Sequence, residues 1–255
     1  MKALIDGDVL LYQAVHQGVI PMSFDGEHYL YAFDKSELME IFSGAVFGIC
    51  AQLEKKIDEA IAPVICLSDS RNFRKSRVDK AYKANRPERK PAAFGVLKEA
   101  VIAKYSPIIQ PYLEADDVMG VLHTQSGRKN TVVCSIDKDM FTLPGYYYNT
   151  DHDELNEVTP TEAEQFFLEQ VLIGDRVDNY FGCPRIGEKT AKKKLTEQGY
   201  CWETVVGLFQ AAGLTSKDAL RNARCAFILQ KPNYSFDTKK IKLWTPENLK
   251  KCVKP

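Results

Sequence analysis

The chain has 255 residues, 45% of them hydrophobic and 27% charged, which is typical of a soluble globular protein with one large domain or slightly more. Lys and Arg number 34, as do Asp and Glu, so the net charge gives no argument for nucleic-acid binding. The start of the chain lacks a signal-peptide pattern, and no apolar run is long enough to span a membrane. Seven scattered cysteines without a C-x-x-C pair predict reduced thiols. We therefore expect a cytoplasmic protein without membrane association.

The first elements predict a strand, an acidic turn and a helix. Residues 2–5 are mostly apolar and run into Asp6, Gly7 and Asp8, after which apolar residues recur at helical spacing. Asp8 can be a metal ligand or the N-cap of this helix, and we favour the cap. Residues 24–33 predict a hairpin closed by Asp-Gly, and a long amphipathic helix follows it.

The next strand leads into the most basic stretch of the chain. Residues 63–67 are apolar and are soon followed by a second acid, Asp69. Residues 71–90 hold nine Lys or Arg against two acids. Such a run is commonly a solvated loop, but Phe73 and Tyr82 lie among the charges, and cations interleaved with rings can bind phosphates and bases. A helix and a short strand are expected next.

Three carboxylates then stand within four positions. Glu114, Asp116 and Asp117 precede an apolar helical pattern, so they lie at or just before the first turn of a helix. A helix N-terminus favours negative charge, which softens the repulsion among the three without abolishing it. The acids can therefore simply cap the helix, or they can bind a cation.

A further strand end also carries carboxylates. Residues 131–136 are apolar and β-branched, and Asp137 and Asp139 follow them. Residues 146–148 predict another strand, and Pro160 begins a helix with a capping-box pattern. Strands that alternate with helices predict an α/β fold with a doubly wound, mainly parallel sheet, whose ligands gather at the carboxyl ends of the strands.

This topology would bring the acids of separate strand ends into one site. So many carboxylates repel one another unless divalent cations neutralise them, and oxygen ligands select Mg²⁺ or Mn²⁺. Asp175 and Asp178 add a pair three positions apart on one face of a helix. Two metals can clamp the attacking and leaving oxygens of a phosphodiester hydrolysis. The nine expected metal ligands are Asp6, Asp69, Glu114, Asp116, Asp117, Asp137, Asp139, Asp175 and Asp178.

The last third of the chain is predicted to be helical to about residue 228, with a late strand at residues 241–244. Residues 182–191 predict a glycine-bracketed hairpin between two helices, and residues 185–194 hold five basic residues against one acid. Glycines and a helix start can bind phosphate, although a plain helical hairpin with solvated lysines also fits this pattern.

Seven short motifs follow one another along residues 6–191. They are Asp6-Gly7-Asp8, Asp69 followed by Phe73-Arg74, Tyr82-Lys83-Ala84-Asn85-Arg86, Glu114-Ala115-Asp116-Asp117, Ser135-Ile136-Asp137-Lys138-Asp139, Gly174-Asp175 with Asp178-Asn179, and Ile186-Gly187-Glu188-Lys189-Thr190-Ala191. In this order they resemble the 5′-to-3′ exonuclease and flap endonuclease superfamily, and their residues are most similar to those of the replication exonucleases of bacteriophages.

The resemblance implies two domains. A PIN-like, Rossmann-like nuclease domain would occupy residues 1–172, with a basic clamp or arch at residues 71–105. A helix-three-turn-helix DNA-binding region and a C-terminal tail would occupy residues 173–255. Only 27 residues separate Arg86 from Glu114, which is short for an enclosed arch that threads a single strand. An open clamp on duplex ends or gaps is therefore expected.

The resemblance also implies the roles of individual residues and the cofactors. Tyr82, Lys83 and Arg86 are expected at the reacting phosphate, beside two Mg²⁺ or Mn²⁺ ions. One K⁺ is expected at the helix-three-turn-helix, in a loop with Cys183 and Ile186. The residues expected to bind DNA are Arg71, Arg74, Lys75, Arg77, Arg176, Arg185, Gly187, Lys189, Thr190, Lys192 and Lys193.

The activity that the resemblance implies is metal-dependent hydrolysis from the 5′ ends of duplex DNA during phage-type replication, with flap cleavage and removal of RNA from RNA–DNA hybrids. The implied partners are DNA with 5′ ends, flaps or gaps, RNA–DNA hybrids, and a replication polymerase or single-strand-binding protein; the protein is expected to be a monomer. Two other readings stay open, a non-catalytic structure-specific DNA-binding protein and a PIN-type ribonuclease. The division of the carboxylates between the metals, and the preference for exonuclease or endonuclease cleavage, also stay open.

Overall fold

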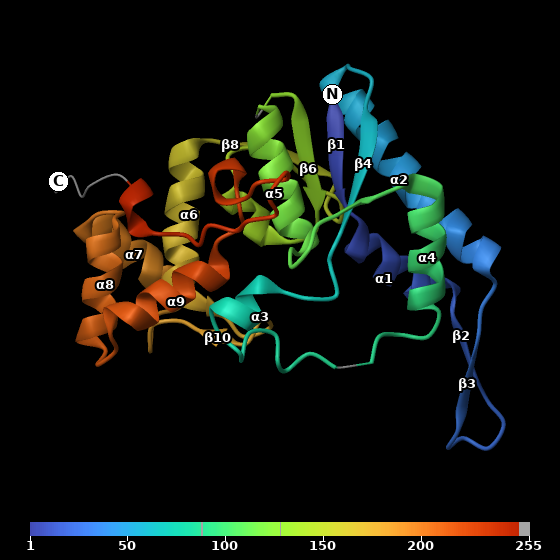
Figure 1. Cartoon of the computed structure of the whole chain (residues 1–255), viewed down its shortest axis with the longest axis horizontal. Coiled ribbons are helices and arrows are strands. Elements are labelled where there is room, and N and C mark those ends of the chain that lie inside the picture. Colours follow the sequence, from blue (N-terminus) through green and yellow to red (C-terminus); the bar gives the residue numbers. More distant parts are fainter. Residues whose placement is uncertain (88, 128, 250–255) are drawn as a thin grey trace. The chain divides into compact units, whose positions relative to one another are not determined.

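The central feature is a six-stranded sheet with the order β5-β4-β1-β6-β7-β8. The computed structural model describes residues 1–87, 89–127 and 129–249 (Figure 1). Strand β1 pairs in parallel with β4 and β6, β4 with β5, and β6 with β7, which confirms the predicted mainly parallel sheet. The strands are β1 Lys2–Asp6, β4 Ala62–Leu67, β5 Ile108–Ile109, β6 Thr131–Ser135, β7 Gly145–Asn149 and β8 Glu154–Val158.

Helices cover both faces of this sheet. Along β1, Ala3 and Ile5 join a buried cluster with residues of three helices, whereas Leu4 is buried on the opposite side. Helix α5, Ala115–Ser126, packs on β1, β4, β5 and β6. The apolar run of β1 is explained by this burial on both faces. The helices of the buried cluster are α1 Gly7–Gly18, α2 Lys35–Ile57 and α4 Phe94–Tyr105.

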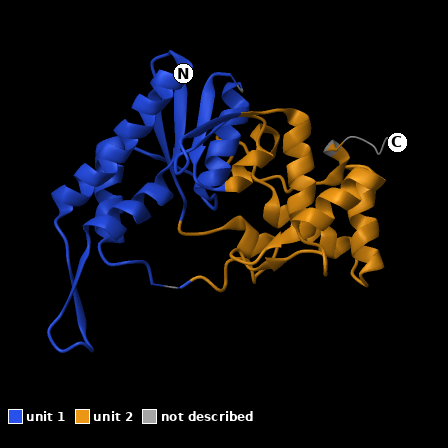
Figure 2. Ribbon diagram, turned by 180° about the vertical axis from the view of Figure 1, so that it is seen from behind, with its two compact units in different colours: residues 1–69, 87–137, 146–156 blue, residues 70–86, 138–145, 157–255 orange. Residues whose placement is uncertain are grey.

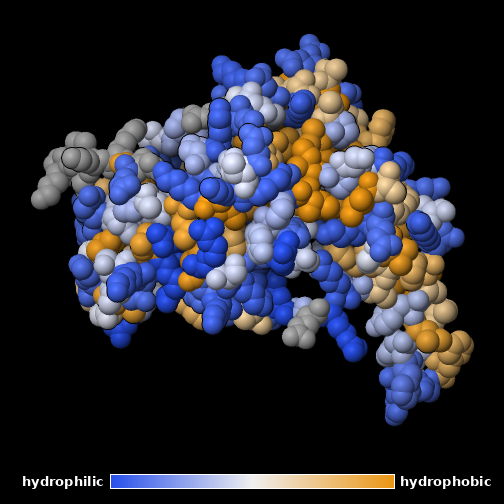
Figure 3. Space-filling view, in the orientation of Figure 1, coloured by the Kyte–Doolittle hydropathy of each residue, from blue (hydrophilic) through white to orange (hydrophobic). Residues whose placement is uncertain are grey.

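The predicted hairpin is a two-stranded ribbon of β2, Ile20–Ser23, and β3, Tyr29–Ala32. It extends away from the sheet, and its apolar side chains are visible in Figure 3. Phe24, at the turn, is 88% exposed. The Asp25 carboxylate accepts hydrogen bonds from the backbone N–H groups of the next turn residues, which closes the loop locally.

The chain forms two compact units that are interleaved in sequence (Figure 2). The first contains residues 1–69, 87–137 and 146–156, and the second contains residues 70–86, 138–145 and 157–255. The expected boundary at residues 172 and 173 would instead give two continuous domains. The second unit contains α3 Phe73–Arg77, η1 Lys138–Thr142, α6 Pro160–Ile173, β9 Gly174–Asp175, β10 Tyr180–Phe181, α7 Glu188–Gln198, α8 Trp202–Ala211, α9 Ser216–Ala226, η2 Lys231–Asn233 and η3 Pro246–Asn248.

Two expectations about the second unit are wrong. Asp175 and Asp178 do not share a helix face, because α6 ends at Ile173 and the short ribbon β9–β10 follows. A Cβ on Gly174 would lie 2.2 Å from the Gly182 nitrogen, so this close approach, together with a φ of +71°, requires glycine. The predicted late strand at residues 241–244 is reduced to one isolated bridge between Tyr234 and Ile241.

The cysteines follow the expected reduced state only in part. Five of them, Cys50, Cys66, Cys134, Cys183 and Cys225, are buried free thiols. Cys201 is disulfide-bonded, so the expectation fails there, and Cys252 lies outside the described residues. No helix within the described ranges has the length and apolarity to cross a membrane.

Two phenylalanines of α2 provide a test of the core of the first unit. Phe42 is fully buried and Phe47 is 74% exposed. We predict that Phe42→Ala lowers the free energy of unfolding by about 3–5 kcal/mol, because a large side chain is removed from a packed cluster. Phe47→Ala, measured in the same urea titration, should change it by less than about 0.5 kcal/mol. Equal losses for the two variants would contradict this packing of α2.

Candidate metal centres

Asp6 is a buried carboxylate at the carboxyl end of β1. It is only 6% exposed, and it is the N-cap of α1, since its Oδ1 accepts from the N–H groups of Asp8 (3.1 Å) and Val9 (3.2 Å). Its Oδ2 accepts from the Ser135 hydroxyl at 3.0 Å. Burial, together with the negative charges of Asp8 and Asp137, raises the pKa of Asp6 to about 7. Burial and the neighbouring acids therefore both oppose the ionisation of Asp6.

Asp8 is not the N-cap that the sequence favours. Its Oδ2 accepts from the Ser68 N–H at 2.9 Å, which links α1 to the end of β4. Its Oδ1 is buried and has no hydrogen-bond partner among the described residues. A buried carboxylate oxygen without a partner is costly, and a bound cation would remove that cost. The ligand alternative for Asp8 is therefore the one that this geometry favours.

Ser68 holds three elements of the first unit together. Besides its N–H bond to Asp8, its hydroxyl accepts from the Ala115 N–H at the start of α5, at 2.9 Å. Its carbonyl oxygen accepts from Lys98 Nζ, also at 2.9 Å. Neither Ser68 nor Lys98 has a predicted role in the site. A serine directly before the acid at a strand end was the available signal for the first, and no signal indicated the lysine on α4.

The three acids of the Glu114–Asp117 motif are not equivalent. Glu114 is the N-cap of α5, and its N–H donates to Asp117 Oδ2 at 3.3 Å. Asp117 is fully buried, whereas Asp116 is half-buried. The negative charges of Asp6 and Asp116 both contribute, after burial, to raising the pKa of the Cys66 thiol. Helix capping thus accounts for part of this motif, and Asp116 is the member that lies within electrostatic range of the same strand ends as Asp6.

The other predicted ligands of the first unit are fixed by their own loops. Asp69 Oδ2 accepts from the Tyr112 N–H at 2.8 Å. Asp137 is exposed, and its N–H donates to the Ser135 hydroxyl at 3.2 Å. No group of three or more His, Cys, Asp or Glu side chains in the described ranges is arranged to hold a metal ion as it stands. The donor set nevertheless suits Mg²⁺ or Mn²⁺, because every proposed ligand is a carboxylate oxygen.

In the second unit, Asp178 is surrounded by donors. Its Oδ2 accepts from the Tyr82 hydroxyl at 2.9 Å and lies 3.4 Å from Lys83 Nζ, and its Oδ1 accepts from Arg86 at 2.5 Å. The backbone N–H of Lys83 also donates to the Asp178 carbonyl at 2.8 Å. Asp178 therefore anchors the three residues that the resemblance places at the reacting phosphate. Tyr82 is only 3% exposed, so its ring is part of the core of this unit.

Asp139 and Asp175 are each fixed through one oxygen. Asp139 Oδ1 accepts from the Gln170 side chain on α6 at 2.7 Å. Asp175 Oδ1 accepts from the N–H groups of Val177 (2.6 Å) and Asp178 (3.3 Å), which closes the turn between β9 and β10. The role of Gln170 cannot be predicted from the local sequence pattern, because its partner is 31 residues away.

The expected DNA-binding residues before residue 80 differ in exposure. Arg71, Lys75 and Arg77 are exposed, and Arg77 donates to the Ile241 carbonyl. Arg74 is 2% exposed, and its guanidinium donates to the carbonyls of Cys225 (3.0 Å) and Phe227 (2.6 Å) at the end of α9. In this position Arg74 closes the C-terminal end of a helix and presents no surface to a phosphate.

The glycine-bracketed segment leads directly into α7. Its N-cap is Gly187, which offers no side chain, and a Cβ there would meet no atom within 4 Å. The first backbone N–H groups of α7 are therefore accessible to an anion. Cys183 is buried, and its carbonyl accepts from the Ile186 N–H at 3.1 Å. The expected DNA contacts that are exposed here are Arg176, Arg185, Gly187, Lys189, Lys192 and Lys193, while Thr190 is half-buried.

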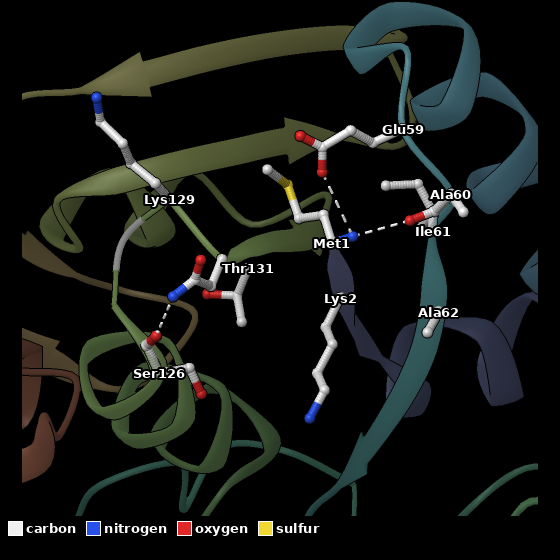
Figure 4. Close-up of a pocket in the computed structure, with 10 residues that line it drawn as sticks. Met1, Lys2, Glu59, Ala60, Ile61, Ala62, Ser126, Lys129 and Thr131 are labelled. Carbon is white, nitrogen blue, oxygen red and sulfur yellow. Dashed lines mark hydrogen bonds and ion pairs between the residues drawn. The ribbon is translucent and has the colours of Figure 1, made fainter.

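A hollow of about 710 Å³ lies at the opposite, amino-terminal edge of the sheet (Figure 4). Met1 lies in it, and the Met1 ammonium donates to the Ala60 carbonyl at 2.8 Å and lies 3.6 Å from a Glu59 oxygen. Ligands of parallel α/β sheets gather at the carboxyl ends of strands, and the carboxylates of this chain do the same. The hollow therefore has no part in the candidate metal centre.

Comparisons with known proteins agree with this geometry. The family described as 5′-3′ exonuclease, N-terminal resolvase-like domain, matches residues 2–167. The exodeoxyribonuclease of Enterobacteria phage T3 is 27% identical over 96% of this chain and 93% of its own length. The exonuclease of Escherichia phage T7 is also 27% identical, over 95% and 93%. The 5′-exonuclease of phage T5, solved with zinc ions, shares the fold, with a TM-score of 0.60, 16% identity, and 89% and 88% of the two chains covered.

The chain belongs to the 5′-3′ exonuclease family, and it is a nuclease. The family match covers the strands that lead to Asp6, Asp69 and Asp137, and it also covers the acids at the start of α5. The relatives from phages T3 and T7 match almost the whole chain, including the segment of α7 to α9.

Divalent metal should stabilise the first unit through Asp6. We predict that Mg²⁺ raises the thermal unfolding midpoint of the wild type, because the ion binds only the folded carboxylate group. Asp6→Asn keeps the N-cap, since Asn caps as well as Asp, but removes one buried charge. This variant should unfold at the same or a higher temperature without metal, and it should lose most of the gain with Mg²⁺. Glu40→Gln, at an exposed position of α2, is the control, and a gain equal in all three proteins would contradict the assignment.

A second prediction separates a structural basic residue, Arg74, from an exposed basic residue that is expected to bind DNA, Lys75. Arg74→Ala should lower the free energy of unfolding by about 2–4 kcal/mol, because two carbonyls lose their donor and a buried side chain is removed. Lys75→Ala, at the exposed neighbouring position, should leave unfolding unchanged and weaken duplex binding with a reduced salt dependence. Urea unfolding and a salt series of binding isotherms measure the two effects. An exchanged pattern would contradict the placement of α3.

Proposed function

We propose that this chain is a divalent-metal-dependent 5′-to-3′ exonuclease that hydrolyses phosphodiesters from the 5′ ends of duplex DNA and RNA–DNA hybrids during phage-type replication. One observation carries the proposal: Asp6 is buried beside Asp8 and Asp137 at the carboxyl edge of the sheet, with its pKa raised to about 7. Family membership supports the reaction class. A buried carboxylate beside other acids lowers the stability of the fold. A metal-dependent hydrolase needs such carboxylates, because they bind its metal ions.

The metal ligands that we propose fall into one group in each unit. In the first unit they are Asp6, Asp69, Glu114, Asp116, Asp117 and Asp137, with Asp8 added; in the second they are Asp139, Asp175 and Asp178. Two Mg²⁺ or Mn²⁺ ions, when bound, would neutralise these carboxylates, stabilise charge that develops on the phosphate and supply a hydroxide nucleophile near neutral pH. The zinc ions in the phage T5 enzyme support metal binding in this fold.

Lys83 and Arg86 are proposed to contact the reacting phosphate. Without substrate both pair with Asp178, so each cation already has a defined position. If Asp178 turns to a divalent ion, the two cations exchange a carboxylate for a phosphate, which conserves their charge pairing. Tyr82, whose hydroxyl is bound to the same carboxylate, orients Asp178 rather than stacking on a base, because its ring is buried.

The region of residues 173–255 is proposed to hold duplex DNA in a helix-three-turn-helix. Two features support contacts to the phosphate backbone of DNA, which carry no sequence information. Helix α7 has no side-chain cap at Gly187, and Lys189, Lys192 and Lys193 are exposed after it. A K⁺ ion in the loop of Cys183 and Ile186 would bind through backbone carbonyls. A phage T5 flap endonuclease has been solved with DNA and metal ions, which supports DNA as the substrate of this fold.

The substrate range is best tested on one panel of 5′-labelled and 3′-labelled duplexes. Blunt, nicked, gapped, flapped and RNA-primed ends, each with and without Mg²⁺, separate exonuclease, flap and hybrid cleavage. We expect Mg²⁺-dependent release of nucleotides or short oligomers from 5′ termini. Tight, salt-sensitive binding without cleavage of any substrate would show a DNA-binding protein, and cleavage confined to single-stranded RNA would show a ribonuclease; either overturns the proposal. Sedimentation and titration with a replication polymerase or single-strand-binding protein test the expected monomer and its partners.

The carboxylates should matter for turnover more than for DNA binding. We predict that Asp116→Asn and Asp137→Asn each lower single-turnover cleavage at least about 100-fold, because a charged metal ligand is lost. Duplex affinity should change less than about threefold, since the basic residues that bind phosphate remain. Glu40→Gln is again the matched control. A parallel fall in affinity and cleavage would place these two acids outside the reaction.

A further inference from the structure

Tyr180 lies directly opposite Asp175 in the short ribbon of the second unit. Strand β10 pairs with β9 in antiparallel register, and Tyr180 is the partner of Asp175. Residues opposite one another in such a pair project from the same face, with Cβ atoms about 4.5–5.5 Å apart. The ring of Tyr180 therefore stands beside the Asp175 carboxylate, which the second unit contributes to the proposed metal group.

The hydroxyl of Tyr180 is buried and has no hydrogen-bond partner among the described residues. The residue as a whole is only 3% exposed. A phenol hydroxyl carries its proton at neutral pH, so this hydroxyl is a donor. It lies within electrostatic range of Asp139, Asp175 and Asp178. A buried donor without an acceptor is costly, and such groups call for a functional explanation when they occur.

A neighbouring tyrosine, Tyr82, has a hydroxyl that already donates to a carboxylate of the same acidic group. The rings of Tyr82 and Tyr180 are stacked, with centroids 6.4 Å apart, and Tyr82 donates to Asp178 Oδ2 at 2.9 Å. Asp139 and Asp175 are each fixed by other donors, the Gln170 amide and the backbone of the turn. Two stacked tyrosines thus serve one acidic group, and only one of them has its acceptor in place.

We propose that Tyr180 is a positioning residue for the carboxylates of the second unit. When a divalent ion draws Asp139, Asp175 and Asp178 together, the Tyr180 hydroxyl donates to a carboxylate oxygen of this group and holds it toward the ion. The proposal rests on the proposed function, because it needs a metal at these residues. Partners of this kind fix the orientation of metal-ligating carboxylates, and losing one typically weakens metal binding by 10-fold to 100-fold.

The test is a Mn²⁺ titration of metal-free wild type, Tyr180→Phe and the control Tyr200→Phe, followed by the thermal unfolding midpoint. Tyr200 donates to Glu169 at 2.6 Å in the same unit, so its replacement removes a satisfied hydrogen bond. Tyr180→Phe should unfold at the same or a higher temperature without metal, and it should need about tenfold more Mn²⁺ for half of the stabilisation. Tyr200→Phe should unfold at a lower temperature and respond to Mn²⁺ as the wild type does.

Cleavage gives a second, independent readout. The Mg²⁺ concentration for half-maximal cleavage should rise about tenfold in Tyr180→Phe, with the rate at saturating Mg²⁺ within about threefold of the wild type. If Tyr180→Phe lowers the metal-free midpoint, or leaves both metal midpoints unchanged while the wild type binds metal, the inference is overturned and the proposed function stands. If the wild type itself shows no response to Mn²⁺ or Mg²⁺, the proposed function fails and the inference fails with it.

Discussion

The burial of Asp6 at the end of β1 is the constraint on which the first unit depends. A carboxylate that is 6% exposed loses hydration, and here the charges of Asp8 and Asp137 add to the penalty. The N–H groups at the start of α1 and the Ser135 hydroxyl offset part of it. The parallel order of β4, β1 and β6 places these groups at one edge of the sheet, so the fold that buries Asp6 also gathers its neighbours.

The second unit handles negative charge in another way. Asp178 is neutralised within the protein by Lys83 and Arg86 and by the Tyr82 hydroxyl. The segment of residues 81–86 is further fixed to the turn after β9, because Asn179 donates to the Ala81 carbonyl at 2.7 Å and Asn85 donates to the Arg176 carbonyl at 3.1 Å. In the first unit, burial and neighbouring acids thus oppose the ionisation of Asp6, whereas in the second unit Asp178 already holds the cations of the basic motif in defined positions.

Much of this arrangement could be read from the sequence, for identifiable physical reasons. Apolar segments that end in acids predict β1, β4 and β6, because hydrophobic periodicity is a local signal. The acids at their ends predict that the site lies at the carboxyl edge of the sheet. The preference for Asp8 as the N-cap is wrong: Asp6 and Asp8 both fit the pattern, and only the hydrogen bonds of the folded chain show that Asp6 caps α1 while Asp8 accepts from Ser68. The buried position of Arg74 and the contacts of Gln170 and Tyr180 depend on partners distant in sequence. A helix was predicted around Asp175 because the pattern does not show the close approach of Gly174 and Gly182.

We propose that the carboxylates of both units bind divalent metal ions, and the number of ions bound per chain decides whether they do. Mn²⁺ titrated into the metal-free protein, with free Mn²⁺ followed by electron paramagnetic resonance, measures this number. We expect two ions per chain for the wild type, and one for a variant in which Asp139 and Asp175 are both changed to Asn. Metal binding by both units is ruled out if the wild type binds no ion, or if the wild type and the double variant bind the same number.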